Sequence, residues 1–193
     1  MMTLIIGGSG SGKSAYAEDY INSLSNRKKK YYIATMQAFD LEGQEKVKRH
    51  QMLRSGKGFY TIEQPVDIQD AVQKMDECEK TALLECISNL AANEMFAGGL
   101  PKQAAIVADA IIDGITVLEK ALTHLVIVSN NVFEDGKTYD KTTMEYIEAM
   151  GQINKRLADM ADEVIEVVVG IPVTVKSGKD NEVRKERTLR CIF

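Results

Sequence analysis

A glycine-rich stretch near the start of the chain has residue types that suit phosphate binding. Residues 7–14 read GGSGSGKS and fit the pattern G-x-x-x-x-G-K-[ST], between the apolar run TLII and a helical pattern. Glycines let the backbone curl so that N–H groups converge on phosphate oxygens. The following helix adds the positive end of its dipole. The stretch therefore predicts a nucleotide-phosphate site made by Gly7, Gly8, Ser9, Gly10, Ser11, Gly12, Lys13 and Ser14.

Two side chains of this loop and one distant carboxylate are candidates for the chemistry. Lys13 is expected to reach the β- and γ-phosphates, and Ser14 is expected to bind Mg²⁺. Such a site also needs an acid at the end of a neighbouring strand, and in TALLECISN Glu85 follows an apolar run. We expect Glu85 to bind the metal, directly or through a water molecule. The alternative is a carboxylate that faces solvent at a strand end.

One of the two histidines lies in a strongly basic stretch. Residues 45–54 read EKVKRHQMLR and place His50 among basic residues that include Lys46 and Arg54. In a helix these two residues lie at i−4 and i+4 from His50, so all three share one face. A neutral imidazole nitrogen in cationic surroundings can attack phosphorus as a nucleophile. The alternative interpretation is a solvated, charged helix that contains a histidine.

Short apolar runs alternate with longer helical patterns. Strands are predicted at residues 3–6, 31–35, 59–63, 82–86, 124–130 and 163–170. Helices are predicted at residues 13–24, 41–54, 67–78, 88–97, 102–122 and 140–161. Continuous apolar strands and βαβ alternation favour a mostly parallel sheet between helices. We expect one three-layer α/β domain of the RecA-like P-loop NTPase class over 1–176, and a C-terminal extension, 177–193, that could form a hairpin near KDN.

The composition narrows the class of protein. The chain has 193 residues and a net charge of −4, without the basic excess of a dedicated nucleic-acid binder. No apolar stretch approaches the roughly 20 residues of a membrane helix, and TLII is too short for a signal peptide. Three cysteines without C-x-x-C spacing favour a reducing compartment. We therefore expect a cytoplasmic protein with no nucleic-acid partner and no membrane span.

The stretch YIATMQAFDLEGQEKVKRH, residues 32–50, resembles the family of bifunctional adenosylcobinamide kinase/adenosylcobinamide-phosphate guanylyltransferases of cobalamin biosynthesis. That family reads roughly Y-I-A-T-x-Q-x-x-D-x-E-x-x-x-[RK]-[IV]-x-x-H over the same length. The resemblance extends to GGSGSGKSAYAE, FYTIEQP, LLECISNLAAN and GQINKRLADMADEVIEVVVGIPVTVK, and it covers about residues 1–176. It implies phosphorylation of adenosylcobinamide by ATP or GTP, then transfer of GMP from GTP through a histidine to give adenosylcobinamide-GDP. It also implies Mg²⁺, a corrinoid substrate and a homo-oligomer, with a trimer as the expected form.

The resemblance also implies roles for individual residues. His50 matches the histidine that is guanylylated in the family. The other matches to nucleotide contacts are Ala34, Thr35, Met36, Gln51, Met52, Leu53, Arg54 and Glu63. Strand-end packing is the competing interpretation for residues 34–36, and solvent exposure is the competing one for Glu63. Asn93 matches a family asparagine, and an asparagine bonded to its own helix is the alternative. We expect structural roles for Asp40, Glu42, His124, Asn154 and Asp162.

One segment departs from the family pattern. After VIVSN the family reads approximately N-E-V-G-x-G-I-V-P and later F-R-D, where this chain has NNVFEDGKTYDKTTMEYIEAMG. Asn131 replaces a glutamate, and a tight glycine turn is lost. The segment follows a parallel strand, on the ligand-binding side of the sheet, so it bears on the second substrate. The alternatives are a P-loop kinase that acts on another small alcohol with His50 not catalytic, or a nucleotide-dependent regulatory module.

Overall fold

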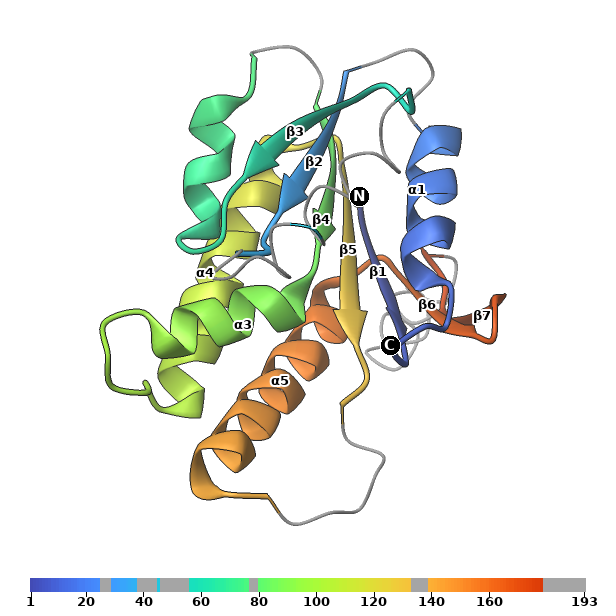
Figure 1. Cartoon of the computed structure of the whole chain (residues 1–193). Helices are drawn as coiled ribbons and strands as arrows, with labels where there is room; N and C mark the ends of the chain where they lie inside the picture. Colours follow the sequence, from blue (N-terminus) through green and yellow to red (C-terminus); the bar gives the residue numbers. More distant parts are fainter. Residues whose placement is uncertain (25–28, 38–44, 46–55, 77–79, 133–138, 179–193) are drawn as a thin grey trace, which may run out of the picture.

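The strands form one seven-stranded sheet in the order β3-β2-β4-β5-β1-β6-β7 (Figure 1). The computed structural model describes residues 1–24, 29–37, 45, 56–76, 80–132 and 139–178. The strands are β1 (Met2–Gly7), β2 (Lys30–Ala34), β3 (Phe59–Glu63), β4 (Thr81–Glu85), β5 (His124–Asn130), β6 (Glu163–Val168) and β7 (Ile171–Lys176). Strands β1 to β6 pair in parallel, and β7 pairs antiparallel with β6. The carboxyl ends of the six parallel strands therefore meet at one edge of the sheet.

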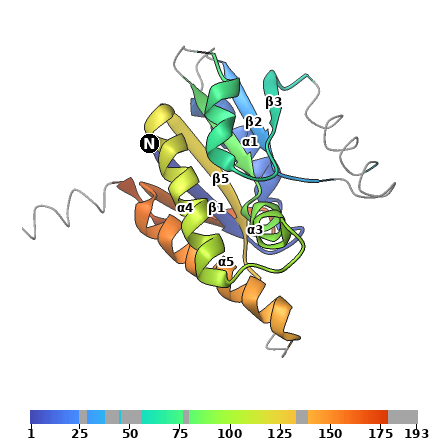
Figure 2. The same ribbon diagram turned by 90° about the vertical axis from the view of Figure 1, so that its left-hand side faces the viewer.

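Helices cover both faces of this sheet. Helix α1 (Lys13–Leu24) packs on one face, where Ala17 and Ile21 join a core with Ile5 and Val126. The other face carries η1 (Ile68–Lys74), a 3₁₀ helix, and the helices α3 (Ile87–Phe96), α4 (Ala104–Ala121) and α5 (Lys141–Met160) (Figures 1 and 2). The expected three-layer, mostly parallel RecA-like architecture is confirmed.

The strand residues explain why the sheet is buried. The β5 segment HLVIVSN is buried from Leu125 to Ser129, which suits a strand covered on both faces. On the helical side, Gly114 lets α4 approach η1 closely, because a Cβ there would lie 2.5 Å from Cγ2 of Ile68. Asp140 caps the start of helix α5, because its carboxylate accepts hydrogen bonds from the N–H groups of Thr142 and Thr143.

The structure corrects two of the predicted elements. The helix predicted at 67–78 is the shorter 3₁₀ helix η1, because Asp67 before it has a left-handed backbone and Met75 after it is extended. The strand predicted at 163–170 ends at Val168, and a tight turn leads into β7, a strand that the pattern did not predict. Apart from Glu45, the expected helix at 41–54 lies outside the described residues, as does the KDN turn.

Within the described part of the chain, no helix combines the length and the apolar character needed to cross a membrane.

Candidate active site

The glycine-rich loop joins the end of β1 to the start of α1. Gly10 and Gly12 have φ angles of 73° and 89°, which side chains other than glycine rarely adopt. The N–H of Ser11 donates to the carbonyl of Gly8 at 3.2 Å, and the N–H of Tyr16 donates to the carbonyl of Gly12 at 3.0 Å. The loop therefore curls back on itself and continues directly into the helix, as the pattern predicts.

Lys13 is buried at the base of this loop, with 8% of the residue exposed. Its Nζ donates to the carbonyl of Gly8 at 3.0 Å, so the ammonium group lies across the loop. Burial lowers the pKa of Lys13, and the neighbouring Cys86 and Glu85 oppose that shift. A phosphate bound in the loop would bring negative charge to this group and favour its ammonium form.

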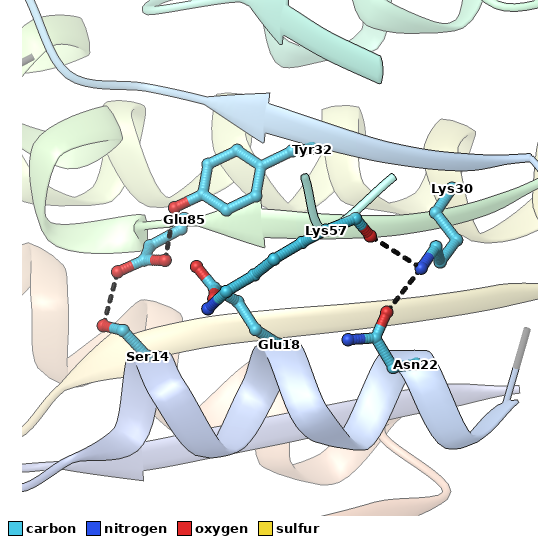
Figure 3. A network of polar contacts seen from close by, with 7 residues as sticks. All are labelled: Ser14, Glu18, Asn22, Lys30, Tyr32, Lys57 and Glu85. Carbon is cyan, nitrogen blue, oxygen red and sulfur yellow. Dashed lines mark hydrogen bonds and ion pairs between the residues drawn. The ribbon is translucent and has the colours of Figure 1, made fainter. Parts of the chain in front are cut away.

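Glu85 ends β4 and lies opposite Ser14, the first residue after Lys13 (Figure 3). The Ser14 hydroxyl donates to Oε1 of Glu85 at 2.5 Å, and the Tyr32 hydroxyl donates to Oε2 at 2.5 Å. One carboxylate thus joins the first turn of α1 to β4 and β2. The contact excludes the alternative in which Glu85 simply faces solvent at a strand end.

The pair of Ser14 and Glu85 has the chemistry of a Mg²⁺ site. Mg²⁺ is usually held by one or two protein oxygen ligands, with water and substrate phosphates completing the octahedron. A hydroxyl and a carboxylate oxygen in contact beside the loop meet that requirement. No group of three or more histidine, cysteine or acidic residues able to hold a metal occurs among the described residues. An ion held here would therefore depend on the nucleotide for further ligands.

Replacement of Tyr32 by phenylalanine is expected to destabilise the fold. Tyr32 is 2% exposed, and the change leaves Oε2 of Glu85 without this donor. A hydrogen bond to a charged group contributes about 1.5–3 kcal/mol, and we expect the free energy of unfolding to fall by that amount. Urea denaturation would measure it. Tyr60→Phe is the matched control, because Tyr60 lies on β3 and is 56% exposed. Equal stability of the Tyr32 variant and the wild type would contradict the role of this bond.

A second group of polar contacts lies further along α1, at Glu18 and Asn22 (Figure 3). Lys57 makes an ion pair with Glu18, and Lys30 donates to the carbonyl of Lys57 at 3.0 Å and to Oδ1 of Asn22. These contacts connect α1 with β2 and with the segment before β3. They hold the helix that carries Lys13 and Ser14 against the sheet.

The end of β2 is fixed by side-chain bonds of its own. The Thr35 hydroxyl donates to the carbonyl of Cys86 and accepts from its N–H, both at 2.8 Å. The Asn93 amide donates to the carbonyls of Thr35, at 2.7 Å, and Pro65, at 3.0 Å. Asn93 thus joins three segments, and this amide bonds neighbouring strand ends rather than its own helix. The hydroxyl of Thr35 therefore has a structural role, because its hydrogen bonds are made to the backbone of Cys86.

Beside Asn93 lies a pocket of about 380 Å³ that the sequence did not predict. Its lining residues are Gln37, Val66, Ala92, Asn93, Phe96 and Ala97. They come from the segments after β2 and β3 and from α3, so the pocket opens at the carboxyl edge of the sheet. Glu63 ends β3 at the same edge and is exposed. Ala34 ends β2 opposite Glu85 in the register of β4.

The segment that departs from the family pattern begins next to the phosphate loop. The N–H of Asn131 donates to the carbonyl of Gly7 at 3.2 Å. The Tyr146 hydroxyl donates to the carbonyl of Ser88 at 3.2 Å, and burial, followed by the charge of nearby Cys86, raises the pKa of Tyr146 to about 12. Residues 133–138 between them lie outside the described part of the chain.

The predicted site residues fall into three groups: those around the phosphate loop, those at or just after the ends of β2 and β3, and those outside the described residues. The structure brings together Lys13, Ser14 and Glu85. His50 and the residues after it, Gln51, Met52, Leu53 and Arg54, lie outside the described residues, as do Asp40 and Glu42. Among the residues expected to be structural, Asn154 bonds to Ser129 and to the carbonyl of Asn130, and the Asp162 carboxylate accepts from the N–H of Met2.

The sheet order and the phosphate loop define the class of protein: a RecA-like P-loop protein that binds nucleotides. The comparison with family models is more specific. The model described as "Cobinamide kinase / cobinamide phosphate guanyltransferase" (CobU) matches residues 3–175, and the chain belongs to that family.

Relatives of known function agree with this assignment. The chain is 32% identical over 185 residues to the bifunctional adenosylcobalamin biosynthesis protein CobU of Salmonella typhimurium, covering 91% of this chain and all of the relative. It is 29% identical over 186 residues to CobU of Escherichia coli, with the same coverage of both chains. It is 24% identical over 176 residues to the bifunctional protein CobP of Pseudomonas aeruginosa, covering 91% and 98% of the two chains.

Solved structures give weaker likenesses. The flagellar accessory protein FlaH from Methanocaldococcus jannaschii aligns with a TM-score of 0.47 and 13% identity, over 91% of this chain and 78% of that chain. The KaiC-like protein PH0186 from Pyrococcus horikoshii aligns with the same TM-score and 11% identity, over 86% and 69%. At this TM-score the likenesses add nothing to the fold assignment, which depends on the strand order and the phosphate loop.

Proposed function

We propose that this chain phosphorylates adenosylcobinamide and then attaches GMP to the phosphate, by way of His50, to give adenosylcobinamide-GDP. The observation that carries the kinase half is the contact of Ser14 with Glu85 beside the buried ammonium group of Lys13. The membership of the family supports the pairing of the two reactions on a corrinoid substrate.

In the first reaction the aminopropanol hydroxyl of the corrinoid attacks the γ-phosphorus of ATP or GTP. The new oxygen–phosphorus bond forms as the bond to the β-phosphate oxygen breaks, the hydroxyl proton is released to solvent, and the nucleoside diphosphate leaves. The N–H groups of the loop hold the phosphates, and the ammonium group of Lys13 offsets the charge on the β- and γ-oxygens. A Mg²⁺ ion on Ser14 and Glu85 would neutralise further charge on the same oxygens.

In the second reaction a neutral imidazole nitrogen of His50 attacks the α-phosphorus of GTP, and pyrophosphate leaves. A phosphate oxygen of the corrinoid product then attacks the same phosphorus. The nitrogen–phosphorus bond breaks, so His50 is regenerated and a diphosphate linkage is formed. Arg54 and Lys46, one helical turn on either side of His50 in a helix, would stabilise the charge on the transferring group.

Mg²⁺ is the expected metal, and the nucleotide contacts extend to Ala34, Thr35, Met36 and Glu63 at the carboxyl edge. Since the Thr35 side chain is committed to Cys86, a contact from Thr35 would come from its backbone. We also propose that the chain acts in the cytoplasm as a homo-oligomer, with the trimer implied by family resemblance.

The test is to incubate the chain with adenosylcobinamide, Mg²⁺ and either ATP alone or ATP with GTP. Chromatography and mass spectrometry should detect adenosylcobinamide phosphate in the first case and adenosylcobinamide-GDP in the second. If the chain binds ATP but forms neither product, the proposal is refuted.

The altered segment after β5 supports an alternative function for this chain. Asn131 stands beside Gly7 in place of a family glutamate, so the acceptor side of the site differs from the family pattern. A chain that consumes ATP only when a different alcohol is added would be a P-loop kinase with another acceptor. Hydrolysis that responds to no small acceptor would indicate a regulatory module.

A further inference from the structure

Asn130 is the last residue of β5 and lies between the two parts of the phosphate site. In the sheet, β5 separates β4, which ends at Glu85, from β1, which leads into the phosphate loop (Figure 1). The register partner of Asn130 on β1 is Gly7, the first residue of that loop. The register partner of Glu85 on β5 is Val128. Asn130 therefore lies two residues beyond the level of Glu85, toward the carboxyl edge of the sheet.

The alternation of side chains along β5 places Asn130 on the face of the sheet that carries the phosphate loop. Val126 and Val128 belong to the core that α1 covers. Since side chains two residues apart in a strand share a face, Asn130 continues the row that these two valines form. Helix α1 begins on that face with Lys13 and Ser14. The Asn130 amide is thus beside the groups expected to bind the phosphates and the metal.

The amide of Asn130 is held by a hydrogen bond at its nitrogen end. Its Nδ2 donates to Oγ of Ser88 at 2.6 Å, and that hydroxyl lies 3.0 Å from Sγ of Cys86. Its Oδ1 is shielded from solvent and has no hydrogen-bond partner within the described part of the chain. A buried oxygen without a partner lowers the stability of a fold, so it needs a specific explanation such as a catalytic role.

The chemistry of this oxygen limits what it can bind. An amide oxygen only accepts hydrogen bonds, so it repels phosphate oxygens and suits a donor. Cys86, at the other end of these contacts, is close enough to Lys13 to oppose the burial that lowers the pKa of Lys13. The contacts therefore connect Asn130 with the surroundings of the ammonium group that is expected to meet the β- and γ-phosphates. The donor that phosphoryl transfer brings to this place is the hydroxyl that attacks the γ-phosphorus.

We propose that Oδ1 of Asn130 accepts a hydrogen bond from the acceptor hydroxyl and orients its oxygen for attack on the γ-phosphorus. This inference rests on the proposed function, in which that hydroxyl belongs to the aminopropanol group of the corrinoid. The amide takes up no proton. The oxygen–phosphorus bond forms, the bond to the β-phosphate oxygen breaks, and the hydroxyl proton is released to solvent. Ser88 is a positioning residue that holds the amide.

The test compares Asn130→Leu with Ser88→Ala, because both changes remove the bond between these two residues and only the first removes Oδ1. At saturating ATP and adenosylcobinamide, the rate of phosphorylation should fall roughly 10–10²-fold in Asn130→Leu, as for a misplaced reactant. Most of the rate should remain in Ser88→Ala. Asn130→Asp keeps an acceptor oxygen at the same place and should recover most of the rate. The affinity for Mg-ATP, measured by calorimetry, should be unchanged in Asn130→Leu and in Ser88→Ala.

Three results would overturn this inference. The first is an unchanged rate of phosphorylation in Asn130→Leu. The second is an equal loss of rate in Asn130→Leu and Ser88→Ala, because the role of Asn130 would then be to fix the start of α3. The third is a loss of Mg-ATP affinity in Asn130→Leu as large as its loss of rate, which would assign the amide to the nucleotide phosphates.

Hydrolysis of ATP separates this inference from the proposed function. Without a corrinoid, water can take the place of the acceptor hydroxyl, and slow hydrolysis should fall in Asn130→Leu by a similar factor. A wild-type chain that hydrolyses ATP but forms no adenosylcobinamide phosphate would refute the proposed function alone. Equal hydrolysis by the wild type and Asn130→Leu would overturn the role of Asn130, whatever the corrinoid result. A chain that binds Mg-ATP and transfers phosphate to neither acceptor would refute both.

Discussion

Replacement of His50 by alanine is expected to abolish the covalent attachment of GMP to this chain. Wild-type protein incubated with GTP and Mg²⁺ should gain the mass of one guanylyl group, which is GMP less water, because the imidazole nitrogen displaces pyrophosphate and keeps the nucleotide. The bond formed is a phosphoramidate, so the adduct should be lost on brief treatment with acid. Intact-mass spectrometry of both proteins measures the result directly.

The second histidine offers a matched control. His124 begins β5 and pairs with Thr81 in the sheet register, at the edge opposite the phosphate loop. His124→Ala should form the adduct like the wild type. A folded wild type that binds GTP without forming an adduct would refute the guanylyltransferase half. If the His50 variant still formed the adduct, the nucleophile would be another residue.

Replacement of Lys13 by alanine is expected to lower corrinoid phosphorylation by roughly 10²–10³-fold, the loss typical of removing one group that stabilises transition-state charge. The ammonium group lies across the loop, 3.0 Å from the carbonyl of Gly8, where bound phosphates would meet it. Its loss removes the positive charge beside the β- and γ-oxygens. Initial rates at saturating ATP and adenosylcobinamide provide the measurement.

Two further variants test whether the effect depends on the ammonium group of Lys13. Lys13→Arg should also fail, because a planar guanidinium group does not fit the buried space of an ammonium group. Lys29→Ala should keep full activity, since Lys29 is paired with Asp76 on the surface. Near-normal activity of Lys13→Ala would refute phosphoryl transfer at this loop. The GMP adduct of the same variant then shows whether both reactions use one triphosphate site.

The features that the sequence determined by itself are local ones. The phosphate loop follows from glycines at positions that need positive φ and from the strand and helix on either side of it. The helix predicted at 13–24 has the observed bounds of α1, in which Ala17 and Ile21 lie one turn apart and are buried. Glu85 was predicted from its place after an apolar run, since the end of a parallel strand is set by a few neighbouring residues. The resemblance of residues 32–50 to a known pattern then identified the family.

The tertiary structure decided what depends on residues far apart in the chain. The bond from Ser14 to Glu85 spans 71 positions, and the bond from Tyr32 to Glu85 spans 53. Neither follows from local pattern, because both require the order in which the strands assemble. The short turn at Val169 was hidden in an apolar run that was predicted as one continuous strand. The N–H of Gly170 in this turn donates to the carbonyl of Ser11 in the phosphate loop, and this contact exists only because β6 pairs with β1. That pairing is set by packing across the whole sheet.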